Sequence, residues 1–299
     1  MSRRRKSAAL QRAEYALYRA VAWFARRLSD DATIRWGARI GSLARRLLRP
    51  RDHVAMRNLR MIFPARSQRE LRAIADACWR HFGREALESI RMQTMSLEEI
   101  ARRCPLVNAR ILDQALARGK GVILISAHYG AWEVGGLALM SAVKNVRTIT
   151  RPLDNEYLER DLARLRSKTG AAVLDRRRAA REMIEALGEN AVIVLLPDQS
   201  VLPREGALVP FLGHDAWTTT LPAKLAIRLG STIVFAFCIA DGTGHRLEFE
   251  GPIQPSEAES DPVALTRRIN EVISARIAAH PELWLWMHDR WKGTSSGGK

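Results

Sequence analysis

Short apolar segments that alternate with helical patterns constrain the fold of this chain more than any other feature. Continuous apolar runs of strand length are typical of strands buried on both faces, and helices between them connect parallel strands. The sequence therefore predicts an α/β fold with a mainly parallel mixed sheet flanked by helices. The predicted strands are residues 121–127, 146–150, 171–175, 191–197, 231–240 and 245–250. The predicted helices of this region are residues 108–118, 133–142, 154–168, 177–188, 219–229 and 262–279.

The remaining segments divide the chain into three parts. Residues 67–92 predict one long helix, because the sequence Ser-Gln-Arg-Glu at 67–70 has the pattern of a capping box. We place basic amphipathic helices in residues 1–60, the α/β domain in 61–292 and a disordered Gly/Ser-rich tail in 293–299. The length of 299 residues and the hydrophobic fraction of 47% suit a folded chain with a core of ordinary size.

Positive charge is concentrated in the first fifth of the chain. The formal net charge of the whole chain is +16, and residues 1–60 hold 16 Lys/Arg against 4 Asp/Glu, a net of +12. So basic a segment suits nucleic acid, an anionic membrane surface or an acidic partner. Charge alone does not choose among these three partners.

The pattern within the basic segment favours a membrane surface. Two stretches have an apolar stripe at helical spacing and arginines away from it. The first stripe is Leu17, Val21, Phe24 and Leu28, opposite Arg12, Arg19 and Arg26. The second stripe is Trp36, Ile40, Leu43 and Leu47, with Arg35, Arg39, Arg46 and Arg49 away from it. Basic amphipathic helices with tryptophan at the apolar margin suit an anionic membrane interface, whereas the alternative is that both stripes pack on the domain.

Several other classes of protein are disfavoured. No apolar run approaches the roughly 18–20 residues of a transmembrane helix, so we expect the chain to lie on a membrane without crossing it. No recognised nucleic-acid-binding motif accompanies the charge, so we expect no nucleic-acid partner. The three cysteines, Cys78, Cys104 and Cys238, are too scattered for a disulfide framework or a CxxC metal site, and we expect reduced thiols.

A histidine directly after the apolar run 121–127 is the first candidate for catalysis. Functional groups gather at the carboxyl ends of strands in open parallel sheets, where His128 and Asp198 are both predicted to lie. Glu133 follows His128 in an H-x4-E pattern, and a tight turn at Gly130 would fold its carboxylate back toward the imidazole. Such a carboxylate would hold one ring nitrogen and leave the other as a general base. The alternative is a strand-end histidine satisfied by nearby backbone groups.

The sequence has a candidate base but no candidate nucleophile. It contains no G-x-S-x-G elbow and no cysteine beside a plausible helper. No His/Cys pair has the spacing of zinc ligands, so we expect no metal and no resident cofactor. A base without a protein nucleophile suggests that a hydroxyl of the substrate attacks an activated acyl group directly. A thioesterase or lipid hydrolase remains open, because water could take the place of that hydroxyl.

Five blocks of the sequence, in order, resemble one known family. The block around His128, "ALARGKGVILISAHYGAWEVGG" (115–136), closely resembles the acyltransferase motif of the lipid A biosynthesis secondary (lauroyl and myristoyl) acyltransferases. These belong to the glycerolipid acyltransferase superfamily, whose hallmark is H-x4-D/E. The other blocks are residues 57–70, 151–159, 195–234 and 281–292, so the resemblance extends over nearly the whole chain. The family motif commonly reads H-F-G-N-W-E, and this chain departs from it at Tyr129 and Ala131 while keeping the base and the carboxylate.

This resemblance implies a glycerolipid acyltransferase-like fold and the transfer of a fatty acyl chain to a hydroxyl of a lipid A precursor. It implies His128 as general base, with Glu133 to orient and charge-stabilise it. Asp198 and Arg166 match further active-site positions, the arginine to stabilise the thioester oxyanion or bind phosphate. The alternatives are that Asp198 caps a turn and that Arg166 pairs with a neighbouring carboxylate. We add five candidate substrate-binding residues: Gly130, Trp132, Arg151, Arg176 and Arg177.

The resemblance also implies partners and a location. The acyl donor would be acyl carrier protein or a coenzyme A thioester, and acidic carrier proteins and phosphorylated lipids are natural partners for arginines. We expect the chain at the cytoplasmic face of the inner membrane, peripheral or monotopic. Another glycolipid or phospholipid acceptor remains open. So does the role of "WLWMHDRWK" (284–292), which rims an acyl tunnel, rests near the membrane interface, or supplies ordinary core and rim residues.

Overall fold

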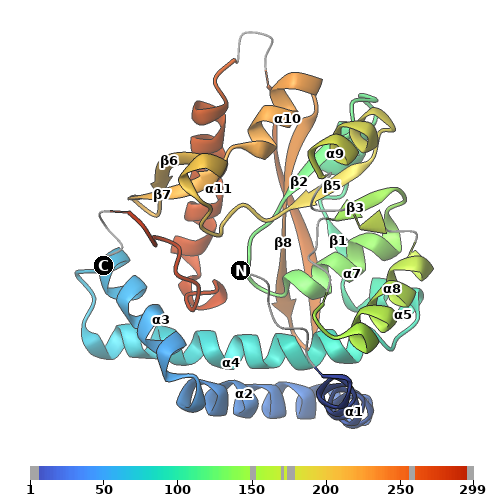
Figure 1. Ribbon diagram of the computed structural model, residues 1–299, viewed down its shortest axis with the longest axis vertical. Coiled ribbons are helices and arrows are strands. Elements are labelled where there is room, and N and C mark those ends of the chain that lie inside the picture. Colours follow the sequence, from blue (N-terminus) through green and yellow to red (C-terminus); the bar gives the residue numbers. More distant parts are fainter. Residues whose placement is uncertain (1–6, 149–152, 170–171, 174–178, 256–259, 295–299) are drawn as a thin grey trace.

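A seven-stranded sheet forms the centre of the chain (Figure 1). The computed structural model describes residues 7–148, 153–169, 172–173, 179–255 and 260–294, with the backbone alone for residues 162, 164–169, 172–173 and 179. The strand order is β1-β9-β8-β2-β5-β3-β4. The strands are β1 (Leu106–Val107), β2 (Val122–Ile125), β3 (Val146–Thr148), β4 (Ala172–Val173), β5 (Val192–Leu195), β8 (Thr232–Asp241) and β9 (Gly244–Ile253). Neighbouring strands are parallel except β8 and β9, so the predicted mainly parallel mixed sheet is confirmed.

Helices cover the sheet and continue into the N-terminal segment. The first helices of the chain are α1 (Ala8–Ala25), α2 (Asp30–Leu47), α3 (Arg49–Ile62) and α4 (Gln68–Met92). The others are α5 (Leu97–Arg103), α6 (Arg110–Leu116), α7 (Trp132–Ala142), α8 (Glu156–Thr169), α9 (Ala179–Gly188), α10 (Leu221–Leu229) and α11 (Pro262–Ala279), with 3-10 turns η1 (Pro203–Glu205) and η2 (Pro281–Leu283). The predicted capping box of α4 is confirmed by reciprocal hydrogen bonds between Ser67 and Glu70.

The short strand β1 and one pair of strands lie outside the predicted elements. β6 (Gly206–Phe211) and β7 (His214–Thr219) form a separate antiparallel hairpin. Pro210 within β6 and polar residues in β7 obscure the strand pattern, because proline cannot donate to a sheet ladder.

Alternating residues of the central strands contribute to hydrophobic clusters on opposite faces of the sheet. In β2, Ile123 and Ile125 belong to the cluster that includes residues of α3, α4, α9, α10 and α11. Val122 and Leu124 belong to the cluster with residues of α5, α6 and α7. Burial on both faces explains why β2 is continuously apolar rather than alternating.

The predicted domain boundary between residues 60 and 61 falls within α3. Ala55, Met56 and Leu59 of this helix belong to the large hydrophobic cluster, so α3 packs as part of the α/β unit. Of the predicted tail, residues 295–299 lie outside the described residues.

Glycines bring α2 into direct backbone contact with α4, which Figure 1 shows between α2 and the sheet. A Cβ added at Gly41 would lie 2.0 Å from the Trp79 carbonyl oxygen, and one at Gly37 would lie 2.4 Å from the Arg84 Cα. Gly83 of α4 completes the contact, because a Cβ there would lie 2.3 Å from the Gly37 carbonyl oxygen. The spacing of four residues between Gly37 and Gly41 places both on one face of α2.

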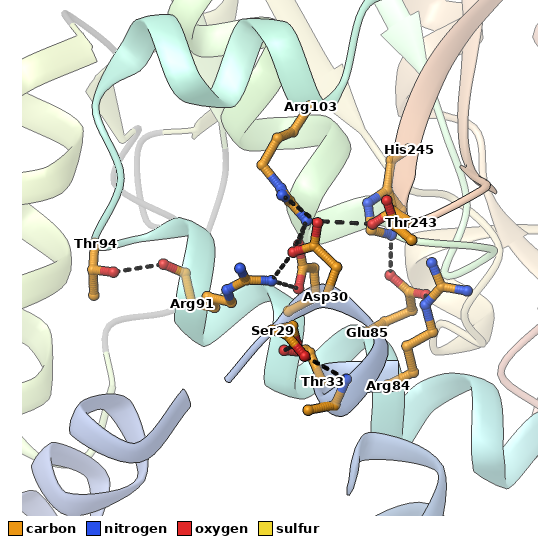
Figure 2. Close-up of polar contacts among 12 residues, drawn as sticks. Ser29, Asp30, Thr33, Arg84, Glu85, Arg91, Thr94, Arg103, Thr243 and His245 are labelled. Atoms are coloured by element: carbon orange, nitrogen blue, oxygen red, sulfur yellow. Dashed lines mark hydrogen bonds and ion pairs between the residues drawn. The ribbon is translucent and has the colours of Figure 1, made fainter. Parts of the chain in front are cut away.

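Ion pairs and hydrogen bonds hold the beginning of α2 and the second half of α4 in place (Figure 2). Asp30, in the first turn of α2, accepts hydrogen bonds from Arg91 at 2.6 Å and from Arg103 of α5 at 3.0 and 3.1 Å. These bonds, that from Arg103 foremost, hold the pKa of Asp30 below its ordinary value. His245 of β9 is bonded to Glu85 of α4 at 2.7 Å. The N-terminal helices are therefore fixed to the α/β domain by charge as well as by packing.

The apolar stripe of α2 faces away from the domain. The face of α2 that packs on α4 consists of small residues, Thr33, Gly37 and Gly41. The stripe itself is exposed: Trp36 by 43%, Ile40 by 46%, Leu43 by 55% and Leu47 by 71%. The alternative that both stripes pack on the domain is therefore wrong for α2. Within the described residues, no helix is long and apolar enough to cross a membrane.

Replacing Gly41 with alanine should destabilise the chain by about 1–3 kcal/mol, because the new Cβ would force α2 and α4 apart. Thermal or urea unfolding measures the loss. Gly136→Ala is the matched control: Gly136 lies within α7 with no atom within 4 Å of an added Cβ, so it should be neutral or stabilise by up to about 1 kcal/mol. Equal stabilities of the two variants would contradict the packing of α2 described above.

Candidate active site

The sheet register brings His128 and Asp198 to the same place. Ile125 at the end of β2 pairs with Leu195 at the end of β5 in parallel register. His128 and Asp198 each lie three residues beyond these partners. Both side chains therefore emerge at the carboxyl edge of neighbouring parallel strands, where ligand sites of open α/β sheets form.

Asp198 holds His128 through both of its carboxylate oxygens. Oδ1 lies 2.9 Å from the His128 Nδ1, and Oδ2 accepts the His128 backbone N–H at 2.9 Å. Oδ2 also accepts the indole N–H of Trp284 at 2.9 Å. Since a carboxylate only accepts, Nδ1 of neutral His128 carries the proton and Nε2 presents a lone pair. The Asp198 side chain is 1% exposed, whereas the His128 side chain is 22% exposed. The imidazole that carries the lone pair is therefore the accessible residue of the two.

The lone pair of His128 faces a side-chain amide. Nε2 of Gln199 lies 3.1 Å from Nε2 of His128. The amide must donate this bond, because the proton of the neutral imidazole is on Nδ1. A substrate group that loses a proton to His128 would take the place of this amide.

Burial and charge act in opposite directions on the pair. Burial lowers the pKa of His128, but the charge and hydrogen bond of Asp198, with a further contribution from Glu133, outweigh it and raise the pKa above 6.5. For Asp198, burial raises the pKa, whereas the charge and hydrogen bonds of His128 and the bond from Trp284 outweigh burial and lower it. The carboxylate thus stays ionised beside a histidine whose protonated form is stabilised.

The acid limb of the pH profile should reflect this raised pKa. A general base works in its neutral form, so kcat/KM should rise with pH through a limb that lies above pH 6.5, the ordinary value for histidine. The pH dependence of kcat/KM measures the limb in the free protein. In Asp198→Asn the raising charge is gone, and the limb should move to lower pH. A limb at or below pH 6.5 in the unaltered chain would contradict the electrostatics of the pair.

The carboxylate partner of the ring differs from the expected one. Asp198, not Glu133, holds Nδ1 of His128. Glu133 is exposed, and its Oε1 accepts the indole N–H of Trp132 at 3.2 Å. It is the second residue of α7, and its influence on His128 is electrostatic. The Trp132 ring lies 5.4 Å from the His128 ring, so this predicted substrate-binding residue does border the base.

A sharp turn after β2 positions the histidine. Gly130 has φ of 61°, and a Cβ there would lie 2.0 Å from the Cys238 carbonyl oxygen of β8. The Gly130 N–H donates to the Leu283 carbonyl at 2.8 Å, and the His128 carbonyl accepts from Leu285 at 3.0 Å. The predicted tight turn at Gly130 is therefore confirmed, while its contact with substrate stays a prediction.

The tryptophan-rich segment 284–292 belongs to the core and supports the site. Trp284, Trp286 and Trp291 are each at most 1% exposed, and the Trp284 ring lies edge-on to both of the others. Arg290 is fully buried as well, and burial lowers its pKa to about 10. The segment thus packs largely in the core and contacts the carboxylate of the site through Trp284, while a place at the rim of an acyl tunnel stays a prediction.

A narrow apolar cavity adjoins the site on the α7 side of the sheet. Trp132, Ser126 and Gly136 line it together with side chains of β2, β5, β8 and β9. Its volume is about 30 Å³, which holds about two waters and no long hydrocarbon chain. A fatty chain would enter here only if the walls moved.

Four predicted residues cannot be placed against the site. Arg151, Arg176 and Arg177 lie outside the described residues, and Arg166 lies in α8 with its side chain outside them. Their roles stay predictions. Among the described residues, no group of three or more His, Cys, Asp or Glu side chains is arranged to hold a metal ion.

The sequence did not predict two contacts of the site, those of Gln199 with His128 and of Trp284 with Asp198. Gln199 directly follows Asp198, and a polar residue beside a predicted strand-end carboxylate is the one signal that could have marked it. Trp284 has no such signal, because it lies 86 positions from Asp198 in the sequence. Only the folded chain brings its indole to the carboxylate.

Comparisons with known proteins identify the family of this chain. The family of bacterial lipid A biosynthesis acyltransferases matches residues 1–293. The lipid A biosynthesis lauroyltransferase of Escherichia coli is 26% identical over 93% of this chain and 90% of its own length. A phosphatidylinositol mannoside acyltransferase of Mycobacterium tuberculosis is 29% identical over 70% of this chain and 67% of its own.

One solved structure is also similar, a 1-acyl-sn-glycerophosphate acyltransferase from Thermotoga maritima. The match covers 67% of this chain and 83% of the Thermotoga maritima chain, with 15% sequence identity and a TM-score of 0.39. The relation rests on the sequence, since the family match spans almost every residue. The chain is an acyltransferase and belongs to the bacterial lipid A biosynthesis acyltransferase family.

Proposed function

We propose that this chain transfers a fatty acyl group from a thioester of acyl carrier protein, or of coenzyme A, to a hydroxyl of a lipid A precursor. One observation carries the proposal: His128 is oriented by a buried carboxylate and presents Nε2 to a partner that is not a protein nucleophile. The hydrogen bonds of the described residues give Nε2 one partner, the Gln199 amide, and no hydroxyl or thiol. Direct attack by an acceptor hydroxyl is the chemistry that this arrangement supports.

The reaction follows from these contacts. The acceptor hydroxyl displaces the Gln199 amide and donates to Nε2 of His128. As its oxygen bonds to the thioester carbonyl carbon, His128 takes the proton, and Asp198 stabilises the imidazolium. The C–S bond then breaks, and His128 returns the proton to the departing thiolate. Glu133 contributes negative charge near the ring, and Arg166 stays the candidate for the oxyanion.

Membrane association is part of the same proposal. Exposed Trp36, Ile40, Leu43 and Leu47 form an apolar face on a helix that also carries arginines. Such a face suits the surface of an anionic bilayer, where a lipid acceptor resides. We place the chain at the cytoplasmic face of the inner membrane, peripheral or monotopic. The basic residues also suit an acidic acyl carrier protein.

A second acceptor class has support of its own. The similarity to phosphatidylinositol mannoside acyltransferases makes a mannosylated phospholipid the alternative to a lipid A precursor. The acceptor hydroxyl would meet Nε2 of His128 in the same way, because the chemistry does not depend on the rest of the lipid.

Parallel acyl-transfer assays test the proposal. The purified chain is incubated with acyl carrier protein thioester and, separately, a lipid A precursor, a phosphatidylinositol mannoside and no acceptor. Mass spectrometry of the lipids and free thiol release measure transfer and hydrolysis. We expect acylated lipid A precursor. Acylation of the mannoside alone would select the alternative, and thiol release that is unaffected by either lipid would identify a hydrolase instead.

A further inference from the structure

A basic hollow lies at the junction of three N-terminal helices, separate from the active site. It opens where the end of α2, the start of α3 and the middle of α4 meet, and its volume is about 650 Å³. The residues that line it include Arg45, Arg46, Arg49 and Arg80. A volume of this size is ordinary for a site that binds a small molecule or a headgroup.

Both acidic residues of the hollow are paired with the same arginine. Arg45 donates to Asp52 at 2.8 Å and is also paired with Asp76. Asp52 accepts a further bond from the Trp79 indole at 3.2 Å. These contacts form a fixed floor in which one arginine serves two carboxylates.

The remaining arginines have no such partners. Among the described residues, no ion pair involves Arg46, Arg49 or Arg80, and all three side chains are exposed. They converge on the hollow from three different helices, α2, α3 and α4. Three unpaired guanidinium groups around one space suit a phosphate, which guanidinium groups bind through paired hydrogen bonds.

The surroundings of the hollow select a lipid rather than a free anion. A groove of about 330 Å³ shares Arg46 and Arg80 with the hollow and continues along α2 past Leu43. Leu47 and Leu48, exposed by 71% and 49%, follow at the end of the same helix. A phosphate in the hollow would thus sit beside an apolar surface, which is the geometry of a headgroup with its acyl chains.

We propose that the hollow between α2, α3 and α4 binds the phosphate of an anionic phospholipid headgroup. The proposal rests on the membrane association inferred above and adds a defined site to it. The bound phosphate bridges three helices, so it fixes the orientation of the chain on the bilayer. It leaves the chemistry at His128 unchanged, because no residue of the hollow contacts the described site.

Vesicle binding of one double variant tests the site. Arg46→Gln with Arg80→Gln is compared with Arg228→Gln with Arg267→Gln. The second pair removes the same charge from exposed residues of α10 and α11, which lie on the other side of α4 from α2 (Figure 1). Co-sedimentation is measured on phosphatidylcholine vesicles that contain phosphatidylglycerol, or cholesteryl hemisuccinate at a matched zeta potential. The first variant should bind phosphatidylglycerol vesicles about 25-fold more weakly, at roughly fivefold per arginine, and the control should bind like the unaltered chain.

The outcomes separate the site from general electrostatics. A headgroup site predicts a much smaller loss on the carboxylate vesicles, whereas equal losses on both vesicles would overturn it. Inorganic phosphate at the same concentration as the phosphatidylglycerol should not release the protein from the vesicles. Its release would also overturn the headgroup site, since the occupant would then be a free anion. Acyl transfer to detergent-dispersed acceptor is measured on the same proteins. Its absence from the unaltered chain would refute the proposed reaction, while the vesicle result alone decides the headgroup site.

Discussion

Replacing His128 with alanine is expected to lower kcat/KM for acyl transfer by about 10²–10⁴-fold, the usual contribution of a well-placed general base. The only ring nitrogen that can accept a proton is Nε2, because Nδ1 is held by Asp198 at 2.9 Å. Without the imidazole, the acceptor hydroxyl would have to attack in its protonated form. The rate is measured with acyl carrier protein thioester and the acceptor identified in the assays above.

A second substitution separates the loss of the base from the loss of the fold. His128→Ala leaves Oδ1 of a buried aspartate without its ring partner, which also costs stability. In His128→Asn, the amide nitrogen can take the position of Nδ1 and donate to Asp198, yet the side chain has no base. We expect His128→Asn to unfold closer to the unaltered temperature and to be as inactive as the alanine variant. Near-native transfer by a folded His128→Asn protein would exclude His128 as the base.

The sheet could be predicted from the sequence because its strands are apolar on both faces. Val122 to Ile125 in β2 and Ile233 to Phe237 in β8 are all buried. Each strand is therefore a continuous apolar run, which can be recognised in the sequence without knowing the neighbouring strands. The order of the strands leaves no such signal, because it depends on pairings between residues far apart, such as Ile125 with Leu195. Both strand-end residues of the site were therefore predicted, and their contact was not.

The choice of Glu133 as the partner of His128 shows the same limit. Separation by five positions suggested proximity, but α7 begins at Trp132 and directs Glu133 outward. Asp198, 70 positions away, reaches the ring because the sheet register places it there. Local spacing marked the strand-end histidine as a candidate, but it could not identify the carboxylate that holds the ring.

The N-terminal helices illustrate what periodicity does and does not contain. It predicted two amphipathic helices, which form as α1 and α2. It could not decide which face of α2 meets the domain, since apolar residues are the usual packing face of a helix. Gly37 and Gly41 decide it, because they allow the α2 and α4 backbones to touch and leave the apolar stripe outside. Glycines four residues apart were the available signal.

Asp198→Asn should lower kcat/KM by about 10²–10⁴-fold, and Glu133→Gln should lower it far less. Asparagine keeps the shape of the side chain, but its amide can donate to Nδ1 and so stabilise the tautomer with the proton on Nε2. That tautomer has no lone pair toward the acceptor. Glu133→Gln removes only a charge on an exposed side chain that makes no hydrogen bond to the ring among the described contacts.

The two variants form a matched pair, since each converts one carboxylate into its amide. Transfer rates measured over a range of acceptor concentrations give kcat/KM and, together with the pH limb, distinguish their effects. A large loss in Glu133→Gln with a small loss in Asp198→Asn would mean that the motif carboxylate moves onto the ring when substrate binds. A large loss in both would mean that the charge of Glu133 is needed in addition to the orientation by Asp198. The expected result is a large loss in Asp198→Asn alone. It would mean that Asp198, which the sheet register places beside His128, orients the base.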